Sequence, residues 1–191
     1  MLLFFDTETT GLPRNWKAPL HDLANWPRMV QLAWLLYDES GQQQEADSRI
    51  VRPERYQIPA RAASIHGIDQ ARAMAEGQPL EEVLGAFDVA LQQAHTLVAH
   101  NLVFDQHILG AEYLRAQGHN PLAAKQGLCT KEAGTSVCRL PGAYGRGYKW
   151  PSLNELHQTL FAEDIVGAHD AAVDIAATAR CFWALRARHA I

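Results

Sequence analysis

Short apolar runs separate amphipathic stretches along most of the chain. Residues 2–5 and 96–99 are continuous apolar runs, which are typical of strands covered on both faces. Residues 29–37 form a longer apolar strand, and Ser40-Gly41 predicts a turn into a returning strand over residues 45–51. The N-terminal quarter is therefore expected to form hairpin-linked strands of one sheet.

Stretches with helical spacing follow these strands. Leu80, Val83, Leu84 and Phe87 repeat at intervals of three and four residues. Helices are expected over residues 79–93, 102–117, 152–161 and 170–188, with a short helical turn at 59–68, a loop at 14–27 and a fifth strand at 126–130. A hairpin followed by strands that alternate with helices predicts an α/β fold, with a central mixed five-stranded sheet flanked by helices. The length fits a single domain over residues 1–191.

Composition and charge narrow the class of protein. No apolar stretch approaches the roughly 18 residues of a membrane span, and the N-terminus has no basic leader, so we expect no membrane association and a cytoplasmic location. Cys129, Cys138 and Cys181 contain no Cys-x-x-Cys pair and are expected to be unpaired thiols. The net charge of −4 argues against electrostatic coating of nucleic acid, but not against an enzyme that grips a few nucleotides through bound cations.

Two acidic residues stand at the end of the first predicted strand. Asp6 and Glu8 are two positions apart, so their side chains should share one face of the strand. Neighbouring carboxylates repel each other, and burial raises the cost further. A solvated strand end would explain the pair, and so would a bound cation.

Two more acids and a histidine fall near predicted helix starts. Asp105 lies in the first turn of the helix over 102–117, where an acid is also favourable without any ligand. Asp174 falls on a mostly small or apolar stripe of the last helix, so it requires a partner, which could be an arginine or a cation. His169 precedes Asp170, the expected cap of that helix. Taken singly, a histidine in a loop is usually only a surface residue.

Together these side chains have a chemistry in common. Oxygen ligands from four carboxylates suit Mg²⁺ or Mn²⁺. Two such ions about 4 Å apart can clamp the attacking and leaving oxygens of a phosphoryl displacement. Histidine as a residue type titrates near neutral pH and can take a proton from the attacking water.

Three segments of the chain resemble the motifs of one enzyme family. Residues 5–12 (FDTETTGL), 100–105 (HNLVFD) and 169–174 (HDAAVD) are similar, in this order, to the three motifs of the DEDD exonucleases, in the histidine variant of the DnaQ-like proofreading type. Residues 65–68 (IHGI) and 152–156 (SLNEL) agree with the same family. The resemblance covers nearly the whole chain and implies a ribonuclease H-like fold.

The resemblance also implies an activity and a set of site residues. The expected reaction is hydrolysis of nucleic acid from the 3′ end, with release of nucleoside monophosphates. His169 is the implied general base, and the implied ligands of two metal ions are Asp6, Glu8, Asp105 and Asp174. The residues implied to lie near the substrate are Thr7, Thr9, Leu12, His66, Asn101 and Phe104. Of these, Leu12 could wedge against a base without reading its sequence.

One position departs from the family pattern, and two segments suggest further contacts with nucleic acid. Family members often carry a glutamate where Arg61 stands, in contact with the terminal sugar, so the choice between DNA and RNA stays open. The loop before Arg28 contains Trp16, Lys17, His21 and Trp26, and residues 144–150 (YGRGYKW) are also aromatic and basic. Such mixtures suit single strands, although the tryptophans could equally pack their own loops down.

Several functions are compatible with these patterns. The leading hypothesis is a free-standing 3′–5′ exonuclease that acts on single-stranded DNA. The alternatives are a proofreading or repair subunit recruited by a DNA polymerase, and an RNA-trimming enzyme of the oligoribonuclease type. From other classes, the candidates are a nucleic-acid-binding module without activity and a phosphatase of the haloacid dehalogenase type. The five reactive side chains and Glu8 in place of a second aspartate favour the exonuclease.

Overall fold

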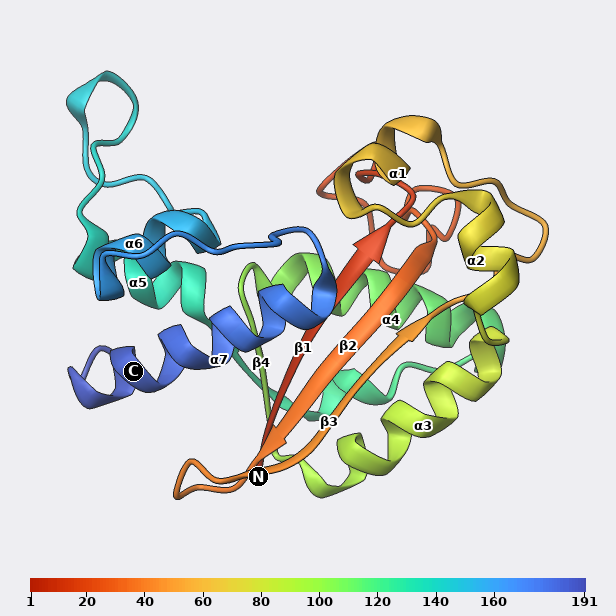
Figure 1. Cartoon of the computed structure of the whole chain (residues 1–191), viewed down its shortest axis with the longest axis horizontal. Helices are drawn as coiled ribbons and strands as arrows, with labels where there is room; N and C mark the ends of the chain where they lie inside the picture. Colours follow the sequence, from red (N-terminus) through yellow and green to blue (C-terminus); the bar gives the residue numbers. More distant parts are fainter.

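A mixed five-stranded sheet forms the centre of the protein (Figure 1). The computed structural model describes residues 1–144 and 146–191, and of Gly145 only its place at the end of a short 3₁₀ turn. The sheet order is β3-β2-β1-β4-β5, in which β1 pairs antiparallel with β2 and parallel with β4. The strands are β1 (Leu2–Thr9), β2 (Met29–Tyr37), β3 (Gln43–Ile50), β4 (Thr96–Ala99) and β5 (Gln126–Cys129). The prediction of an α/β fold with a mixed sheet is confirmed, and the fold is ribonuclease H-like.

Seven α-helices in the described part of the chain surround this sheet. They are α1 (Ala60–His66), α2 (Gln70–Glu76), α3 (Leu80–Gln93), α4 (Leu102–Gln117), α5 (Thr130–Cys138), α6 (Leu153–Phe161) and α7 (Ala171–Ala187), with the 3₁₀ turns η1 (Pro121–Ala124) and η2 (Ala143–Gly145). Each of these helices in the described residues is too short or too polar to cross a bilayer.

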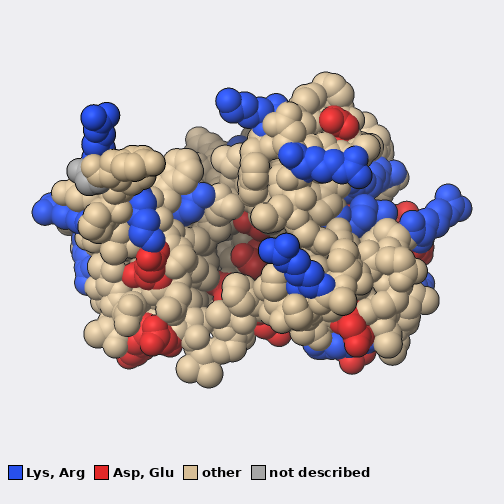
Figure 2. Space-filling view, turned by 90° about the horizontal axis from the view of Figure 1, so that it is seen from above, with Lys and Arg blue, Asp and Glu red and all other residues tan. Residues whose placement is uncertain are grey.

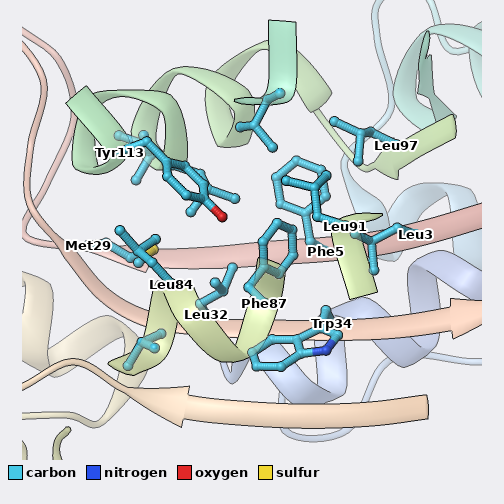
Figure 3. Close-up of a cluster of buried hydrophobic side chains, with 14 of the residues drawn as sticks. Leu3, Phe5, Met29, Leu32, Trp34, Leu84, Phe87, Leu91, Leu97 and Tyr113 are labelled. Carbon is cyan, nitrogen blue, oxygen red and sulfur yellow. The ribbon is translucent and has the colours of Figure 1, made fainter. Parts of the chain in front are cut away.

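Alternate residues of β1 face two different layers of helices. Phe5 points to the side of α3 and α4, where its ring lies 5.9 Å from that of Phe87 (Figure 3). Phe4 points to the opposite side, where its ring lies 5.0 Å from that of Phe182 in α7. The even-numbered positions of β1 therefore face α7, and the odd-numbered positions face α3 and α4.

Most predicted elements and their ends are confirmed. Ser152 caps α6 with a reciprocal capping box, and Asp170 caps α7 by accepting a hydrogen bond from the Ala172 amide. Gly118 ends α4 in the left-handed conformation, with φ of 74°. The three cysteines are unpaired, as predicted. The loop over 14–27 has neither helix nor strand.

Three boundaries or elements differ from the prediction. β1 continues to Thr9, because β2 pairs with it beyond the apolar run. The helices α2 and α5 were not predicted, because neither has a regular apolar repeat. In α5, Gly134 looks like a helix breaker in the sequence, but a Cβ at this position would lie 2.7 Å from Leu156 Cδ1. At the close approach of α5 to α6, glycine therefore fits without displacing the Leu156 side chain.

Candidate active site

Three of the expected carboxylates meet at the boundary between β1 and α7. Asp6 and Glu8 occupy even-numbered positions of β1 and so face α7, in continuation of the packing face of Leu2 and Phe4. Asp174 lies in the first turn of α7. One carboxylate oxygen from each of these three residues lies within 4.8 Å of the other two. The strand alternation and the helix start thus bring together side chains that are 168 positions apart in the sequence.

The N-terminus of α7 is fixed to the sheet by a buried glutamine. Gln31 in β2 accepts a hydrogen bond from the Ala171 amide at 3.3 Å, and its amide nitrogen donates to Ser48 Oγ at 3.0 Å. The pairing of β1 with β2 shifts register between Glu8 and Thr9, opposite this contact. Such irregularities re-aim side chains next to functional sites. Together they set where Asp174 stands relative to β1.

Asp105 reaches the same end of β1 from the opposite layer. It lies in the first turn of α4 and is buried. Its Oδ1 accepts two hydrogen bonds from Thr7, from the backbone N–H at 3.1 Å and from the hydroxyl at 2.7 Å. Thr7 occupies an odd-numbered position of β1 and so faces α4. Asp105 therefore lies beside the group of Asp6, Glu8 and Asp174 but is not one of the residues whose carboxylate oxygens lie within 4.8 Å of one another.

The surroundings of all four carboxyl groups raise their pKa values and so disfavour the ionised form. Burial, followed by the charge of Asp105, raises the pKa of Asp6 well above its usual value. Burial and the charge of Asp174 raise the pKa of Glu8 to about 8. Burial raises the pKa of Asp105 to about 7, against the opposing effect of its hydrogen bonds from Thr7. Burial also raises the pKa of Asp174. The group stores electrostatic repulsion that a positive charge would relieve.

The donor set fits a hard divalent cation. Within the described residues, no lysine or arginine forms an ion pair with any of the four carboxylates. An arginine partner for Asp174, the alternative left open by the sequence, is therefore not found there. Carboxylate oxygens are the ligands that Mg²⁺ and Mn²⁺ prefer.

His169 lies at the edge of this group. It precedes the cap of α7 in an exposed turn and has a left-handed backbone, with φ of 71°. Its backbone N–H donates to Asp174 Oδ2 at 3.1 Å, and this hydrogen bond and a charge on His169 both oppose the rise in the pKa of Asp174 that burial causes. His169 is thus positioned beside the carboxylates, and its side chain is exposed.

A pocket of about 460 Å³ opens next to Glu8. Its lining includes Thr9, Leu12, His66, Phe104 and Arg61. Leu12 is 72% exposed at the tip of a turn, and Thr9 supports that turn because its hydroxyl donates to the Gly11 carbonyl at 2.7 Å. A large exposed apolar side chain beside a pocket is suited to contact with a ligand.

His66 lines this pocket with a buried ring. The side chain is buried, and burial lowers its pKa, which favours the neutral ring. Nδ1 accepts from the Ile68 amide at 3.2 Å, so the proton of the neutral ring lies on Nε2. Among the described residues, Nε2 is buried without a hydrogen-bond partner of normal geometry, although the Thr9 carbonyl is near enough to oppose part of the effect of burial on the pKa of His66.

Two of the residues expected to contact the substrate, Thr7 and Asn101, form side-chain hydrogen bonds within the protein. Thr7 lines the pocket, but its hydroxyl is used by Asp105. Asn101 has a left-handed backbone, and its side-chain oxygen accepts a hydrogen bond from Lys131 Nζ. Asn101 lines a second pocket together with Phe104 and Lys131. Lys131 was missed by the sequence analysis, because no motif marks it and only the fold brings α5 beside Asn101.

The surface around the site is acidic at the centre and basic at the rim. Figure 2 shows Asp and Glu side chains at the bottom of a hollow, between the part with α5 and α6 and the part with α1 and α2. Lys and Arg side chains lie around its edges. Such a distribution suits a polyanion whose phosphates contact the Lys and Arg side chains at the edges of the hollow, while bound cations neutralise the acidic side chains inside it.

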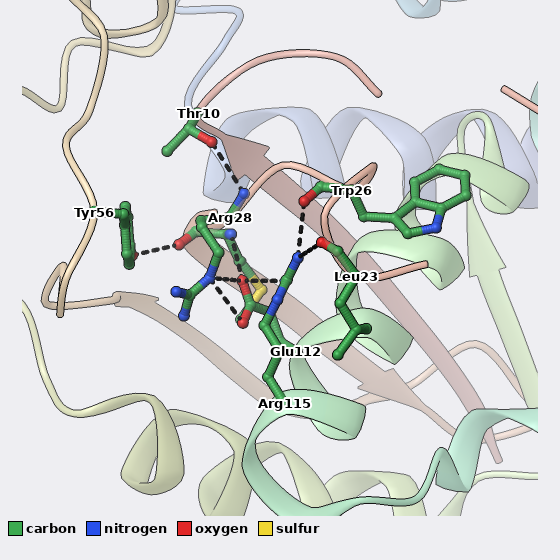
Figure 4. Close-up of polar contacts among 8 residues, drawn as sticks. Thr10, Leu23, Trp26, Arg28, Tyr56, Glu112 and Arg115 are labelled. Carbon is green, nitrogen blue, oxygen red and sulfur yellow. Dashed lines mark hydrogen bonds and ion pairs between the residues drawn. The ribbon is translucent and has the colours of Figure 1, made fainter. Parts of the chain in front are cut away.

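A buried ionic network ties the long loop before β2 to α4 (Figure 4). Glu112 in α4 is buried and accepts from Arg28 Nε at 2.8 Å and from the Met29 amide at 2.9 Å. It also pairs with Arg115 at 3.1 Å, and Arg115 in turn donates to the carbonyls of Leu23 and Trp26. The loop is thus held in place by a carboxylate 84 residues away from its end.

The family assignment rests on a match along most of the chain. Residues 3–182 match the model of the exonuclease family named for RNase T. The chain belongs to this exonuclease family. A divalent metal cofactor is implied for such nucleases, and the carboxylate group at Asp6, Glu8 and Asp174 is consistent with one.

Solved structures of exonucleases share this fold. Escherichia coli exonuclease I in complex with a dT13 oligonucleotide is 20% identical with a TM-score of 0.73, over 98% of this chain and 41% of that one. The zinc-bound form of the E. coli exonuclease I complex with single-stranded DNA is 21% identical with a TM-score of 0.71, over 98% and 40%. Exonuclease X in complex with 5′ overhanging duplex DNA is 22% identical with a TM-score of 0.62, over 99% and 93%. The chain thus spans about two fifths of the exonuclease I structures.

A search of curated proteins gave no match to this chain. At these identities the structural likeness establishes the fold, while the match over residues 3–182 establishes the family to which the chain belongs. With the family known, the phosphatase alternative is excluded.

Proposed function

We propose that the protein removes nucleoside monophosphates from the 3′ end of nucleic acid, with single-stranded DNA as its substrate. The observation that carries the proposal is the meeting of Asp6, Glu8 and Asp174, with Asp105 beside them, next to a pocket of about 460 Å³. Oligonucleotides bound to exonucleases I and X, which share the fold, support a DNA substrate.

Asp6, Glu8, Asp105 and Asp174 would hold two divalent ions, Mg²⁺ or Mn²⁺. When bound, such ions supply an activated water and stabilise the charge that develops on the phosphate. The raised pKa values of Glu8 and Asp105 imply that protons leave the site as cations enter. Thr7 keeps Asp105 oriented and partly offsets the effect of its burial.

His169 would accept the proton of the attacking water. It stands beside Asp174 at the open edge of the site, where a water molecule can approach from solvent. Deprotonation of water by a positioned base is needed at the moment when its oxygen attacks phosphorus, and the proton can then leave through an exposed side chain.

The pocket next to Glu8 would receive the 3′-terminal nucleotide. Leu12 would stack against its base, since an apolar side chain contacts any base face without reading its sequence. His66, which lines the same pocket, would lie beside the sugar or phosphate. Phe104, which also lines the pocket, would offer a second apolar contact to the nucleotide.

Arg61 keeps the trimming of RNA as a second candidate function, because it leaves the choice of sugar open. It lines the pocket in which the terminal sugar would lie, at the position of the glutamate of many family members. A cationic donor contacts sugar hydroxyls differently from a carboxylate, and the 2′-hydroxyl is what separates RNA from DNA.

A time course on 5′-labelled oligonucleotides tests direction and sugar preference together. DNA and RNA of the same sequence, single-stranded and duplex, are incubated with Mg²⁺ or Mn²⁺. We expect a descending ladder of 5′-labelled products, with single-stranded DNA degraded fastest. Immediate release of the label as a mononucleotide would contradict the proposed polarity, and faster loss of RNA would favour the second candidate.

A further inference from the structure

A second pocket, of about 380 Å³, adjoins the proposed site of the terminal nucleotide, and Phe104 lines both. Trp16 comes from the loop over 14–27, Lys131 from the first turn of α5 and Trp150 from the segment before α6. We call Trp16, Phe104, Lys131 and Trp150 the aromatic slot. Trp16 and Trp150 are 55% and 61% exposed, so packing of the protein core does not explain them.

The first wall of the aromatic slot is built on the anchored loop. The ring of Trp16 lies 5.7 Å from that of Phe104, at an interplanar angle of 45°. The rest of the loop is held to α4 by the Glu112 network and by the stacking of Trp26 on His107 at 4.5 Å. Trp16 is therefore presented from a fixed loop without being buried by it.

Trp150 forms the opposite wall of the aromatic slot, and its position is fixed by contacts of Lys131 and of the neighbouring Pro151. Lys131 Nζ lies 4.5 Å from the centre of the Trp150 ring and also donates to Asn101 Oδ1. The backbone next to Trp150 is fixed because His100 Nε2 donates to the Pro151 carbonyl at 3.1 Å. Both walls are thus positioned before any ligand arrives, which lowers the entropic cost of binding.

The chemistry of the aromatic slot suits a nucleotide. Flat rings stack on any base, and Lys131 supplies a charge for a backbone phosphate. Glu132 also lines the pocket. Its negative charge does not oppose the stacking of a base, because a base carries no net charge. Phe104 is shared with the first pocket, so a strand whose last nucleotide lies there would continue into the aromatic slot.

We propose that the aromatic slot binds the nucleotides immediately upstream of the 3′ terminus of a single strand, by stacking on Trp16 and Trp150 and by contact of Lys131 with a phosphate. The proposal rests on the proposed exonuclease function. It assigns the role of a single-strand contact to Trp16 and Trp150.

Comparison of a one-nucleotide substrate with an oligonucleotide tests the aromatic slot. The p-nitrophenyl ester of thymidine 5′-monophosphate occupies the first pocket alone, while an oligothymidylate of about eight nucleotides would fill both. We expect Trp16→Ala and Trp150→Ala each to raise KM on the oligonucleotide by about five- to a hundredfold, because base stacking on aromatic rings is of this strength. The kcat/KM on the ester should change less than about twofold.

Conservative and surface variants serve as controls. Trp16→Phe and Trp150→Phe should keep most of the affinity for the oligonucleotide, because a ring remains. Val89→Ala removes an equally exposed apolar side chain on α3, outside both pockets, and should change neither substrate. Thermal unfolding of each variant checks that the fold is retained.

The outcomes separate this proposal from the proposed function. If Trp16→Ala and Trp150→Ala change both substrates equally, or neither, the aromatic slot is not a binding site for the upstream strand. If the wild-type protein cleaves neither substrate, the proposed function fails. The binding of a 5′-fluorescent oligothymidylate, measured by anisotropy, then still decides whether the tryptophan variants weaken its Kd.

Discussion

Thr7 donates both its backbone N–H and its hydroxyl to Oδ1 of Asp105, at 3.1 and 2.7 Å. A carboxylate at the start of one helix is thereby oriented by the strand that carries two others. Hydrogen bonds to a charged group are worth about 1.5–3 kcal/mol, and they favour the ionised form. The contact is therefore expected to prepare Asp105 for a cation.

Thr7→Val removes the hydroxyl and keeps the side-chain shape. We expect the Mg²⁺ concentration for half-maximal activity to rise by about ten- to a hundredfold, since the ionised state of Asp105 loses a hydrogen bond. Thr178→Val is a matched control, because that buried hydroxyl has no hydrogen-bond partner among the described residues. An unchanged Mg²⁺ requirement in Thr7→Val would show that the contact has no part in metal binding.

The stability of the metal-free protein should depend on pH. Burial raises the pKa of Glu8 to about 8 and that of Asp105 to about 7, whereas unfolded carboxyl groups titrate near 4. Between these values the folded state binds more protons, so the free energy of unfolding falls as pH rises. In EDTA we expect Tm to decrease from about pH 5 to about pH 8.5.

Removal of a charge should reduce this dependence. Glu8→Gln is expected to raise Tm in EDTA at about pH 8.5 by at least 2–4 °C, which corresponds to about 1 kcal/mol in a protein of this size. Mg²⁺ should stabilise the wild type more at pH 8.5 than at pH 5, because the ligands must lose their protons. A Tm in EDTA that is constant or rises over this range would contradict the repulsion described for the site.

Glu112 should matter for stability far more than an exposed acid does. It is buried and satisfies Arg28, the Met29 amide and Arg115 at once. Glu112→Ala leaves buried groups without partners and is expected to lower the free energy of unfolding by about 3–5 kcal/mol. Urea denaturation measures the loss.

An exposed pair provides the comparison for Glu112. Glu76→Ala breaks the contact of Glu76 with Arg72 at 3.0 Å on the surface of α2, and should cost about 0.5 kcal/mol or less. If both variants lose the same stability, the network does not anchor the loop.

His169→Ala tests the proposed base. We expect kcat to fall by about 10²–10⁴-fold with little change in KM, as is usual for the loss of a general base. His189→Ala is the control, since it also removes an exposed histidine with a left-handed backbone, there at the end of α7. Equal effects of the two substitutions on kcat would assign His169 a role in the backbone turn alone.

The sheet and the main helices could be predicted because their patterns are local. Strand β2 is a run of apolar residues, and α6 begins at a recognisable capping box. By contrast, α5 contains Gly134, and a glycine suits this position because the side chain of Leu156 in α6 packs against it. No local pattern contains that information.

The candidate site was predictable in part for the same reason. The period of a strand places Asp6 and Glu8 on one face, and the helix start places Asp174 and Asp105. The contacts that support them join distant segments, as Gln31 does with Ala171. Lys131 and the Glu112 network also depend on packing over long sequence separations, so no motif indicated them.

The most direct measurement is the release of nucleoside monophosphates from a single-stranded oligonucleotide, compared among the wild type, Asp6→Asn and Asp174→Asn. Asp164→Asn, an exposed acid before α7, serves as the control. The account predicts activity in Mg²⁺ or Mn²⁺ for the wild type and Asp164→Asn, background activity in excess EDTA, and folded but inactive Asp6→Asn and Asp174→Asn. Activity that survives in excess EDTA, or in either of these two variants, would contradict catalysis by metal ions held at these carboxylates.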